Sequence, residues 1–258
     1  MGCYHPFMWS SILTGLTDII FPRNCILCRR YHPATAHDPL CPPCREAVPW
    51  NKPPFCVRCS RHLDSLTEES LCPSCRAHPP HFDEGWALVN YDGPVRDLLL
   101  RFKFHDKTSI RLTFTTILKE FIARYTLRFP DAAMVIPMPL HPTRLRERGY
   151  NQAALLGACM AQELNLPLME NTLQRQRHTL RQSELPAKDR WTNISGAFTI
   201  NPVFAADIVG REVLLVDDIL TTGATASEAA KTLKDAGASR VIIITLAIAS
   251  CASYATTY

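Results

Sequence analysis

Eight cysteines in the first third of the chain form four Cys-x-x-Cys pairs that repeat with a fixed offset. The pairs begin at Cys25, Cys41, Cys56 and Cys72, and 31 residues separate the first pair from the third and the second from the fourth. This region is therefore an internal duplication. Two residues between cysteines let a tight turn bring both sulfurs to one tetrahedral ion, and two such turns complete a four-cysteine zinc site. The predicted ligands are Cys25, Cys28, Cys41 and Cys44 for one zinc ion and Cys56, Cys59, Cys72 and Cys75 for another.

A disulfide framework is the main alternative to zinc, and it requires an oxidising compartment. Residues 1–9 contain no Lys or Arg and precede no uninterrupted apolar run of signal-peptide length, so nothing there indicates export. The cysteine segment is rich in Pro and Arg and offers little apolar material for a core, so metal binding must supply folding energy. Two further alternatives stay open: an interleaved pairing, and replacement of one cysteine by His32, His37, His62 or His78.

The length and charge of the chain limit its organisation and partners. With 258 residues it has room for an amphipathic helix within 1–21, a double zinc ribbon over 22–80 and an α/β domain over 81–258. The net charge of +4 is too small to indicate nucleic acid as a partner. Residues 22–80 hold eight Lys or Arg against five Asp or Glu, and each zinc ion with four thiolates adds about −2. The module therefore has no general affinity for a phosphate backbone. A local basic patch is still an alternative, formed by Arg29, Arg30, Arg58 and Arg61.

The N-terminal segment carries an apolar stripe at helical spacing, formed by Ile12, Leu13, Leu16, Ile19 and Ile20. This helix is expected to dock on its own domain. Contact with a membrane or a partner protein is the alternative, although the polar face lacks basic residues. No stretch of the chain approaches the roughly 20 apolar residues of a membrane span. The sequence therefore predicts a cytoplasmic protein without a transmembrane segment, with peripheral contact at a membrane left open.

Beyond Pro79 and Pro80 the paired cysteines end, and strand and helix patterns alternate. Strands that are apolar on both faces and separated by helices are typical of a parallel sheet, so the predicted fold class is α/β. Ligands of such sheets bind beyond the carboxyl ends of the strands. The predicted strands are Met134 to Pro139, Arg211 to Asp218 and Arg240 to Ala249, and the predicted helices are Asn151 to Leu164 and Thr225 to Ala236.

One of these carboxyl ends carries the second strong signal, the segment VLLVDDILTTGAT from Val213 to Thr225. Two adjacent carboxylates, Asp217 and Asp218, follow four apolar residues, and a loop of short side chains with one glycine then leads into a helix. The backbone N–H groups of such a loop and the positive end of the helix can hold a phosphate. It is not a Walker loop, because no lysine completes it. A plain alternative for the loop end is a capping box of Thr225 and Glu228.

At all thirteen positions this segment resembles the phosphoribosyl-pyrophosphate (PRPP) binding motif of the type I phosphoribosyltransferase family. The resemblance implies that Asp217 and Asp218, as the catalytic pair, bind the ribose hydroxyls, with Mg²⁺ shared with the pyrophosphate. The transition state of these transferases is a dissociating glycosidic bond, so positioned charge would supply catalysis without a protein nucleophile. The 5′-phosphate would bind to Thr221, Thr222, Gly223, Ala224 and Thr225.

Three further segments narrow the family. They are YDGPVRDLLLRFKFHDK from Tyr91, PMPLHPTRLRERGYNQAALL from Pro137, and LQRQRHTLRQSELPAKDRWTNISGAF from Leu173. Together with the cysteine module they are similar to the ComF family of bacterial competence proteins, over a range from Ile12 to about Ala249. The resemblance implies a double zinc ribbon with one or two structural Zn²⁺ ions, followed by a type I phosphoribosyltransferase-like domain.

The same resemblance implies roles for residues outside the PRPP motif. A loop over Met138 to Arg148 would bind pyrophosphate, with Arg144 as the anion ligand. The arginines Arg146 and Arg181 can equally belong to a solvated face, and Asn151 can be no more than a helix N-cap. A mobile loop that closes over the site would include Arg175, Arg177, Thr179 and Gln182, and these residues together with Arg148 would contact DNA or pyrophosphate.

Three hypotheses about function follow. The ComF resemblance implies a protein of DNA uptake in natural transformation that handles single-stranded DNA at or near the cytoplasmic face of the inner membrane. Arginine-rich loops around a phosphate site suit a nucleic-acid backbone. The second hypothesis is an active phosphoribosyltransferase that uses PRPP or another phosphorylated small molecule, with Mg²⁺ and an unidentified acceptor base. In the third, the zinc module docks a protein of the competence machinery. The first is preferred, and enzymatic turnover is left open because one fold hosts many activities.

Overall fold

The computed structural model describes residues 24–32, 39–64, 70–102, 107–125, 129–177, 179 and 187–249. The helix expected within residues 1–21 lies outside the described residues, as do His37, Arg181 and Gln182. Among the described residues, no helix is both long enough and apolar enough to cross a membrane.

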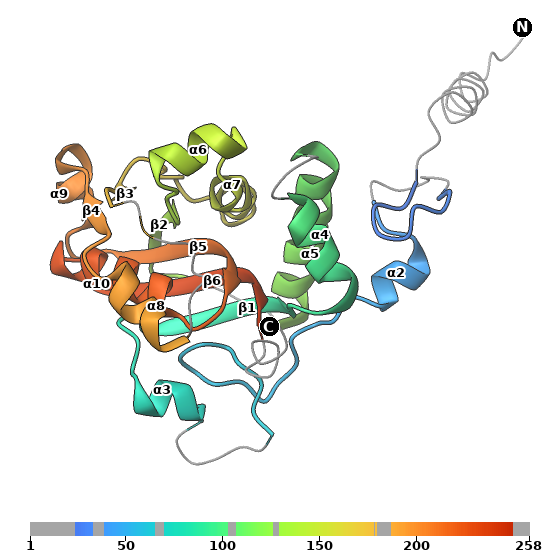
Figure 1. Cartoon of the computed structure of the whole chain (residues 1–258), viewed down its shortest axis with the longest axis horizontal. Helices are drawn as coiled ribbons and strands as arrows, with labels where there is room; N and C mark the ends of the chain where they lie inside the picture. Colours follow the sequence, from blue (N-terminus) through green and yellow to red (C-terminus); the bar gives the residue numbers. More distant parts are fainter. Residues whose placement is uncertain are drawn as a thin grey trace, which may run out of the picture.

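A parallel sheet of four strands forms the centre of the molecule (Figure 1). The parallel sheet and the three strands predicted from the sequence are confirmed, and a further strand, β1, lies at one edge. The order across the sheet is β1 (Glu84–Asn90), β6 (Arg240–Ile248), β5 (Glu212–Leu220) and β2 (Ala132–Pro137).

The bounds of all three predicted strands differ from the expectation by one or two residues, and strand pairing explains the extensions of β2 and β5. β2 begins at Ala132, which pairs with Glu212, and it ends at Pro137. β5 continues beyond Asp218 to Leu220, because its last residues still pair with β6. Asp218 therefore lies two residues before the end of the strand, whereas the sequence placed it at the end.

Alternate residues of the strands face two different cores, which is why these strands are apolar throughout. Val213 and Leu215 of β5 share one core with Leu233 of α10 (Ala224–Asp235). Leu214 and Val216 lie in the other core. Helices α4 (Gly93–Phe102), α5 (Lys107–Tyr125) and α7 (Gln152–Leu164) supply that second core.

Shorter elements surround the carboxyl ends of the strands. Helix α6 (Pro142–Arg148) follows β2; it starts with a proline after the N-cap His141 and ends at Gly149, whose φ of 73° is left-handed. Asn151 is the N-cap of α7, as the sequence suggested. The remaining elements are β3 (Leu173–Arg175), antiparallel to β4 (Phe198–Ile200), the helices α8 (Ala187–Ile194) and α9 (Ala205–Ile208), and a 3₁₀ turn at Pro202–Phe204.

The duplication seen in the cysteine pattern is also present in the backbone. In each ribbon the first cysteine closes a turn, with Cys25 N donating to Arg30 O and Cys56 N donating to Arg61 O, both at 2.8 Å. A short helix follows the third cysteine of each ribbon and begins with proline. These helices are α2 (Pro42–Glu46) and α3 (Pro73–Ala77), again 31 residues apart.

The two ribbons pack on different parts of the α/β domain, as Figure 1 shows for α2 and α3. The first contacts α4 and α5: Arg101 Nη1 donates to Ile26 O at 2.9 Å, and Arg45 pairs with Glu120 at 2.8 Å. The second lies against the start of β1, where a Cβ on Gly85 would be 2.6 Å from the Arg58 carbonyl oxygen. Only glycine allows this close approach of two backbones.

Candidate functional site

Both cysteine clusters have the geometry of a zinc site. In each, all four Sγ atoms lie within 4.8 Å of one another. Cys28 and Cys41 sulfurs are 3.7 Å apart, and those of Cys59 and Cys72 are 3.6 Å apart. A tetrahedral zinc ion with Zn–S bonds of about 2.3 Å needs sulfurs about 3.8 Å apart. The donor sets therefore fit zinc.

The ligand pairing predicted from the repeat is confirmed. The first and second Cys-x-x-Cys pairs form one cluster, and the third and fourth form the other, so the interleaved arrangement is wrong. Within the described residues, His32, His62 and His78 belong to neither cluster. The clusters differ in burial, because all four cysteines of the second are buried whereas Cys28 of the first is exposed.

Crowding of the thiols shifts their pKa values in opposite directions. In the second cluster, hydrogen bonding with Cys59 lowers the pKa of Cys56, and hydrogen bonding with Cys56 raises the pKa of Cys59. The Cys56 thiolate is thus stabilised by hydrogen bonds from neighbouring cysteines that remain protonated. Zinc would replace those protons, and all four sulfurs would bind as thiolates.

A cleft of about 540 Å³ opens where β2 and β5 end. Its volume lies in the range of roughly 300–1,000 Å³ that is typical of ligand sites. Thr222, Ala224, Arg177 and Thr179 are not among the residues that line it, and Gln182 is not described. The remaining predicted site residues do line the cleft: Asp217, Asp218, Thr221, Gly223, Thr225, Arg144, Arg148 and Arg175.

The loop after β5 directs the N-terminus of a 12-residue helix toward the cleft. Gly223 is the N-cap of α10, and its φ of 82° is the left-handed conformation that glycine adopts without strain. Gly223 and Thr225 both line the cleft, so the positive end of the helix dipole faces it. Thr222 Oγ1 accepts a hydrogen bond from Ala224 N at 3.4 Å and steadies the turn.

The capping-box alternative for this loop is wrong. The helix begins at Ala224, so Thr225 is already inside its first turn. Glu228 does not reach back to a cap residue; its Oε1 accepts from Gly196 N at 2.6 Å. Glu228 therefore ties α10 to the turn after α8.

The carboxylate pair forms the acidic side of the cleft. Asp217 Oδ1 accepts a hydrogen bond from Asp218 N at 2.8 Å, and both side chains are partly exposed. Asp217 still pairs with Thr245 of β6 in the sheet, which fixes its backbone. The pair is thus rigidly held and accessible to a ligand.

Two arginines of the cleft converge on Thr179. Arg175 Nη2 donates to Thr179 Oγ1 at 2.5 Å, and Arg144 Nη2 donates to the Thr179 carbonyl at 3.1 Å. Arg175 is only 8% exposed, and its guanidinium lies 5.6 Å from the centroid of the Phe198 ring. Burial, and then the neighbouring Arg144, lowers the pKa of Arg175 to about 10, while Asp217 opposes the shift. Arg175 is a desolvated cation for which an anionic ligand would compensate.

The other predicted loop residues have different surroundings. Arg148 lines the cleft and donates to Gln152 Oε1 at 3.2 Å. Arg177 is exposed, and its guanidinium donates to the carbonyl oxygens of Asn193 and Ser195. Arg146 is exposed, as expected for a solvated face.

Sequence reasoning missed two arginines at this site. Arg190 of α8 is 5% exposed and lines the cleft. The sequence did not indicate its burial, because a charged residue within a polar helix is usually exposed. Arg61, from the second ribbon, donates from Nη2 to the Thr221 carbonyl at 3.0 Å. Arg61 and Thr221 are separated by 160 residues in the sequence, so no local pattern could predict this contact.

Comparison with known proteins assigns both parts of the chain. Residues 16–77 match the double zinc ribbon domain family, and residues 153–255 match the phosphoribosyl transferase domain family. A solved structure, the glutamine PRPP amidotransferase from B. subtilis, is 15% identical, covers 57% of this chain and 30% of its own, and has a TM-score of 0.36. That similarity is too distant to add to the assignment.

Three curated relatives are closer in sequence. Competence protein F of Haemophilus influenzae is 35% identical over 173 residues, which are 65% of this chain and 74% of the relative. The DNA utilization protein YhgH of Escherichia coli K12 is 30% identical over 167 residues, 63% of this chain and 71% of the relative. Competence protein ComFC of Bacillus subtilis is 29% identical over 152 residues, 58% of each chain. With its double zinc ribbon and transferase domain, this chain belongs to the ComF family of competence proteins.

Proposed function

We propose that this protein acts in DNA uptake during natural transformation and handles single-stranded DNA through a phosphate-binding cleft of the PRPP type. The observation that carries the proposal is the composition of one cleft. It brings together the carboxylates Asp217 and Asp218, the helix N-terminus at Gly223 and the buried cation Arg175. The names of the relatives, two competence proteins and a DNA utilization protein, favour DNA as the biological substrate.

Each side of the cleft suits a different chemical group. The N-terminus of α10 would accept a phosphate. Asp217 and Asp218 would repel that phosphate and would accept ribose hydroxyls instead. Arg144 and Arg175, which meet at Thr179, offer two guanidinium groups to a second phosphate. A sugar that carries two phosphate groups would supply a partner for each of these groups.

Magnesium fits the acidic side of the cleft. The Asp217 and Asp218 carboxylates are the hard oxygen ligands that Mg²⁺ prefers, and the cleft leaves room for its waters. When bound, the ion would neutralise the oxygens of a pyrophosphate.

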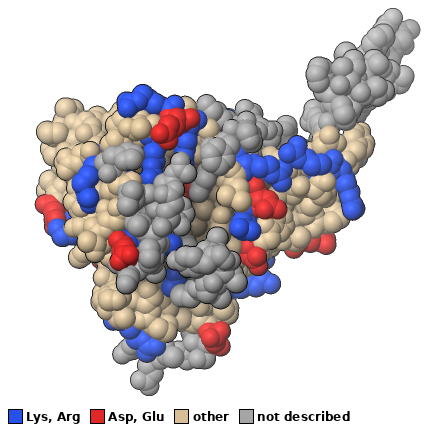
Figure 2. Space-filling model, in the orientation of Figure 1, with Lys and Arg blue, Asp and Glu red and all other residues tan. Residues whose placement is uncertain are grey.

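A DNA strand offers phosphates in repeating form but no free sugar hydroxyls, because deoxyribose lacks the 2′-hydroxyl and its 3′ and 5′ oxygens are esterified within the strand. The N-terminus of α10 and the arginines would therefore bind DNA, and the carboxylates would not. On the face drawn in Figure 2, Lys and Arg side chains line the upper side of the arm that carries the first ribbon. Such a band attracts a polyanion at low ionic strength. The band would assist the approach of DNA to the protein.

An active phosphoribosyltransferase with PRPP, Mg²⁺ and an unidentified acceptor base is the second candidate. The carboxylate pair favours it, because a site for DNA phosphates alone would not place two carboxylates beside the phosphate loop. In such a reaction the protein would orient the donor, and Arg144 and Arg175 would stabilise the departing pyrophosphate. Docking of a competence-machinery protein on the zinc module is compatible with either candidate.

Isothermal calorimetry of the zinc-loaded protein with PRPP and Mg²⁺ tests the donor site. Saturable binding is expected in the parent, and the double variant Asp217→Asn, Asp218→Asn should lose it because amides are poor magnesium ligands. Arg144→Met should weaken binding, whereas Arg146→Met, on the exposed side of the same helix, should not. No heat from folded protein with its zinc would exclude a PRPP site.

Fluorescence anisotropy with a labelled single-stranded oligonucleotide tests the DNA part of the proposal. The variants Arg144→Met and Arg175→Met should weaken DNA binding and reduce its salt slope by about 0.7 for each phosphate of the single strand that the protein no longer neutralises. The Asp217→Asn, Asp218→Asn variant should bind DNA as tightly as the parent or slightly more tightly. DNA affinity that does not respond to either arginine would place the DNA elsewhere on the surface.

A further inference from the structure

The loop that would hold a phosphate rests on the second zinc ribbon. Arg61 ends the turn formed by Cys56 and Cys59, and its Nη2 donates to the Thr221 carbonyl at 3.0 Å. Thr221 is the first residue after β5 and therefore the start of the loop. Because the acceptor is a backbone oxygen, this contact fixes the path of the chain.

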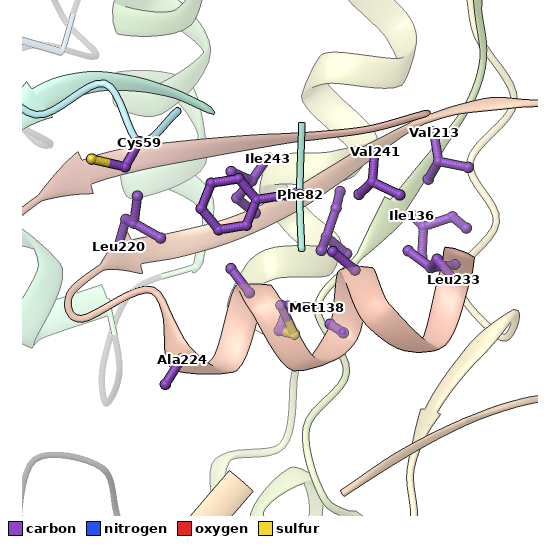
Figure 3. Packing of buried hydrophobic residues seen from close by; sticks show 14 of the residues in the cluster. Cys59, Phe82, Ile136, Met138, Val213, Leu220, Ala224, Leu233, Val241 and Ile243 are labelled. Carbon is purple, nitrogen blue, oxygen red and sulfur yellow. The ribbon is translucent and has the colours of Figure 1, made fainter. Parts of the chain in front are cut away.

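The apolar side of the loop packs on the same ribbon. Cys59, Phe82, Leu220 and Ala224 belong to one core, and Figure 3 shows Cys59 and Phe82 near Leu220, where β5 leads into the loop. A Cβ on Gly223 would be 3.9 Å from the Phe82 ring. A small cavity between ribbon and loop is lined by Cys59, Arg61, Cys75, Trp191, Thr221 and Gly223, among others.

The segment that leaves the second ribbon also holds the helix after the loop. His81 N donates to Ser227 Oγ at 3.0 Å in the first turn of α10. At the other end of the helix, Lys234 Nζ lies 2.7 Å from Asp83 Oδ1. Arg58 Nη1 in the ribbon donates to the Asp83 carbonyl at 3.0 Å. Both ends of α10 are thus connected to the ribbon.

The first ribbon provides an internal comparison. The offset of 31 residues makes Arg30 the counterpart of Arg61, and both end the same type of turn. Arg30 is exposed, and the first ribbon packs on α4 and α5 instead. The two ribbons share a backbone design, but the second one contacts the phosphate loop.

We propose that the second ribbon is a positioning element of the ligand site, with Arg61 as the positioning residue that holds the phosphate loop. Zinc in the Cys56, Cys59, Cys72 and Cys75 cluster keeps the turn in place, and Arg61 transmits that position to Thr221. Zinc in the first cluster has no such role. The effect on ligand affinity rests on the proposed function, whereas the effect on the loop itself does not.

Hydrogen exchange and calorimetry on paired variants test this inference. In Arg61→Met, the amides of residues 221–225 should exchange faster without ligand, and ribose 5-phosphate should bind about tenfold more weakly. Magnesium pyrophosphate does not need the phosphate loop, so its affinity should not change. Arg61→Lys should recover part of the affinity, because it keeps a donor at that position. Arg30→Met should match the parent in every respect, and both variants should retain two zinc ions per chain.

The outcomes separate the inference from the proposed function. Unchanged exchange of residues 221–225 in Arg61→Met, or equal effects of Arg61→Met and Arg30→Met, would overturn the inference. If the parent binds no phosphorylated ligand, the proposed function fails, and hydrogen exchange still decides the role of Arg61. Cys28→Ser removes an exposed ligand of the first cluster only. Faster exchange of the loop in that variant would contradict the assignment to the second ribbon.

Discussion

At the scale of single residues, the cleft contains a charge whose burial is unfavourable. Arg175 is 8% exposed, and burial is the main cause that lowers its pKa to about 10. A lowered pKa of a base means that the folded protein holds the cation less favourably than water does. Such a charge in a cleft is typical of a functional site, because a ligand of opposite charge compensates for it.

Replacing Arg175 by methionine should therefore separate stability from binding. Without ligand, the free energy of unfolding should change by less than about 1 kcal/mol, since the missing hydrogen bond to Thr179 is offset by relief of desolvation. Affinity for PRPP should fall at least tenfold, or about 1.4 kcal/mol. Urea unfolding and calorimetry on one preparation measure both quantities. A stability loss of several kcal/mol would make Arg175 a structural residue, and Arg146→Met should change neither quantity.

At the scale of elements, two ribbons with one backbone design have different surroundings. The first leaves Cys28 exposed to solvent, whereas the second buries all four of its cysteines against the core that contains Phe82 and Leu220. Access to the sulfurs, rather than the intrinsic chemistry of four thiolates, then determines how fast a chelator acts.

Zinc release to a chelator should therefore be biphasic, with the first cluster losing its ion faster. A chromogenic chelator added to the native protein measures both phases. The fast phase should be absent in Cys28→Ser, which would contain one slowly released zinc ion. Release of both zinc ions from the parent in a single phase would contradict the inference that burial protects the second cluster from the chelator.

At the scale of the whole molecule, one buried side chain joins the ribbons to the sheet. Asn51 is fully buried between them, and its Nδ2 donates to the carbonyl oxygens of Ser60 at 2.7 Å and of Ala87 at 3.2 Å. The same segment pairs with the free edge of β1 through Asn51 N and Leu88 O at 3.1 Å. The chain between the ribbons thus covers a sheet edge that would otherwise be open to other strands.

Asn51→Leu should destabilise the whole protein by roughly 2–6 kcal/mol, because two buried carbonyl groups lose a donor at a cost of about 1–3 kcal/mol each. Urea unfolding followed by tryptophan fluorescence and by zinc release should show one shared transition. Asn90→Ala, which removes a weaker hydrogen bond to Trp50 O at 3.4 Å, should cost much less. Release of the second zinc ion before the sheet unfolds would show that the ribbon is an independent unit.

Local spacing determined much of this protein from its sequence. The 31-residue repeat gave the ligand sets of both clusters, because two-residue spacing and a duplicated turn are properties of the chain itself. The apolar runs gave the parallel sheet, and VLLVDDILTTGAT gave a strand, loop and helix in the observed order. Bounds moved by one or two residues, since pairing with β6 extends β5 and Gly223 begins α10 early.

Contacts between distant segments were decided only by the tertiary structure. Arg61 and Thr221 are 160 residues apart, and no local pattern distinguishes Arg61 from its counterpart Arg30. Arg190 reaches the cleft because of how α8 packs. Arg175 loses its solvation through burial beside Phe198, and the like charge of Arg144 lowers its pKa further. Sequence spacing specifies which atoms can share a turn or a metal ion, whereas burial and charge at a site depend on which surfaces the whole chain brings together.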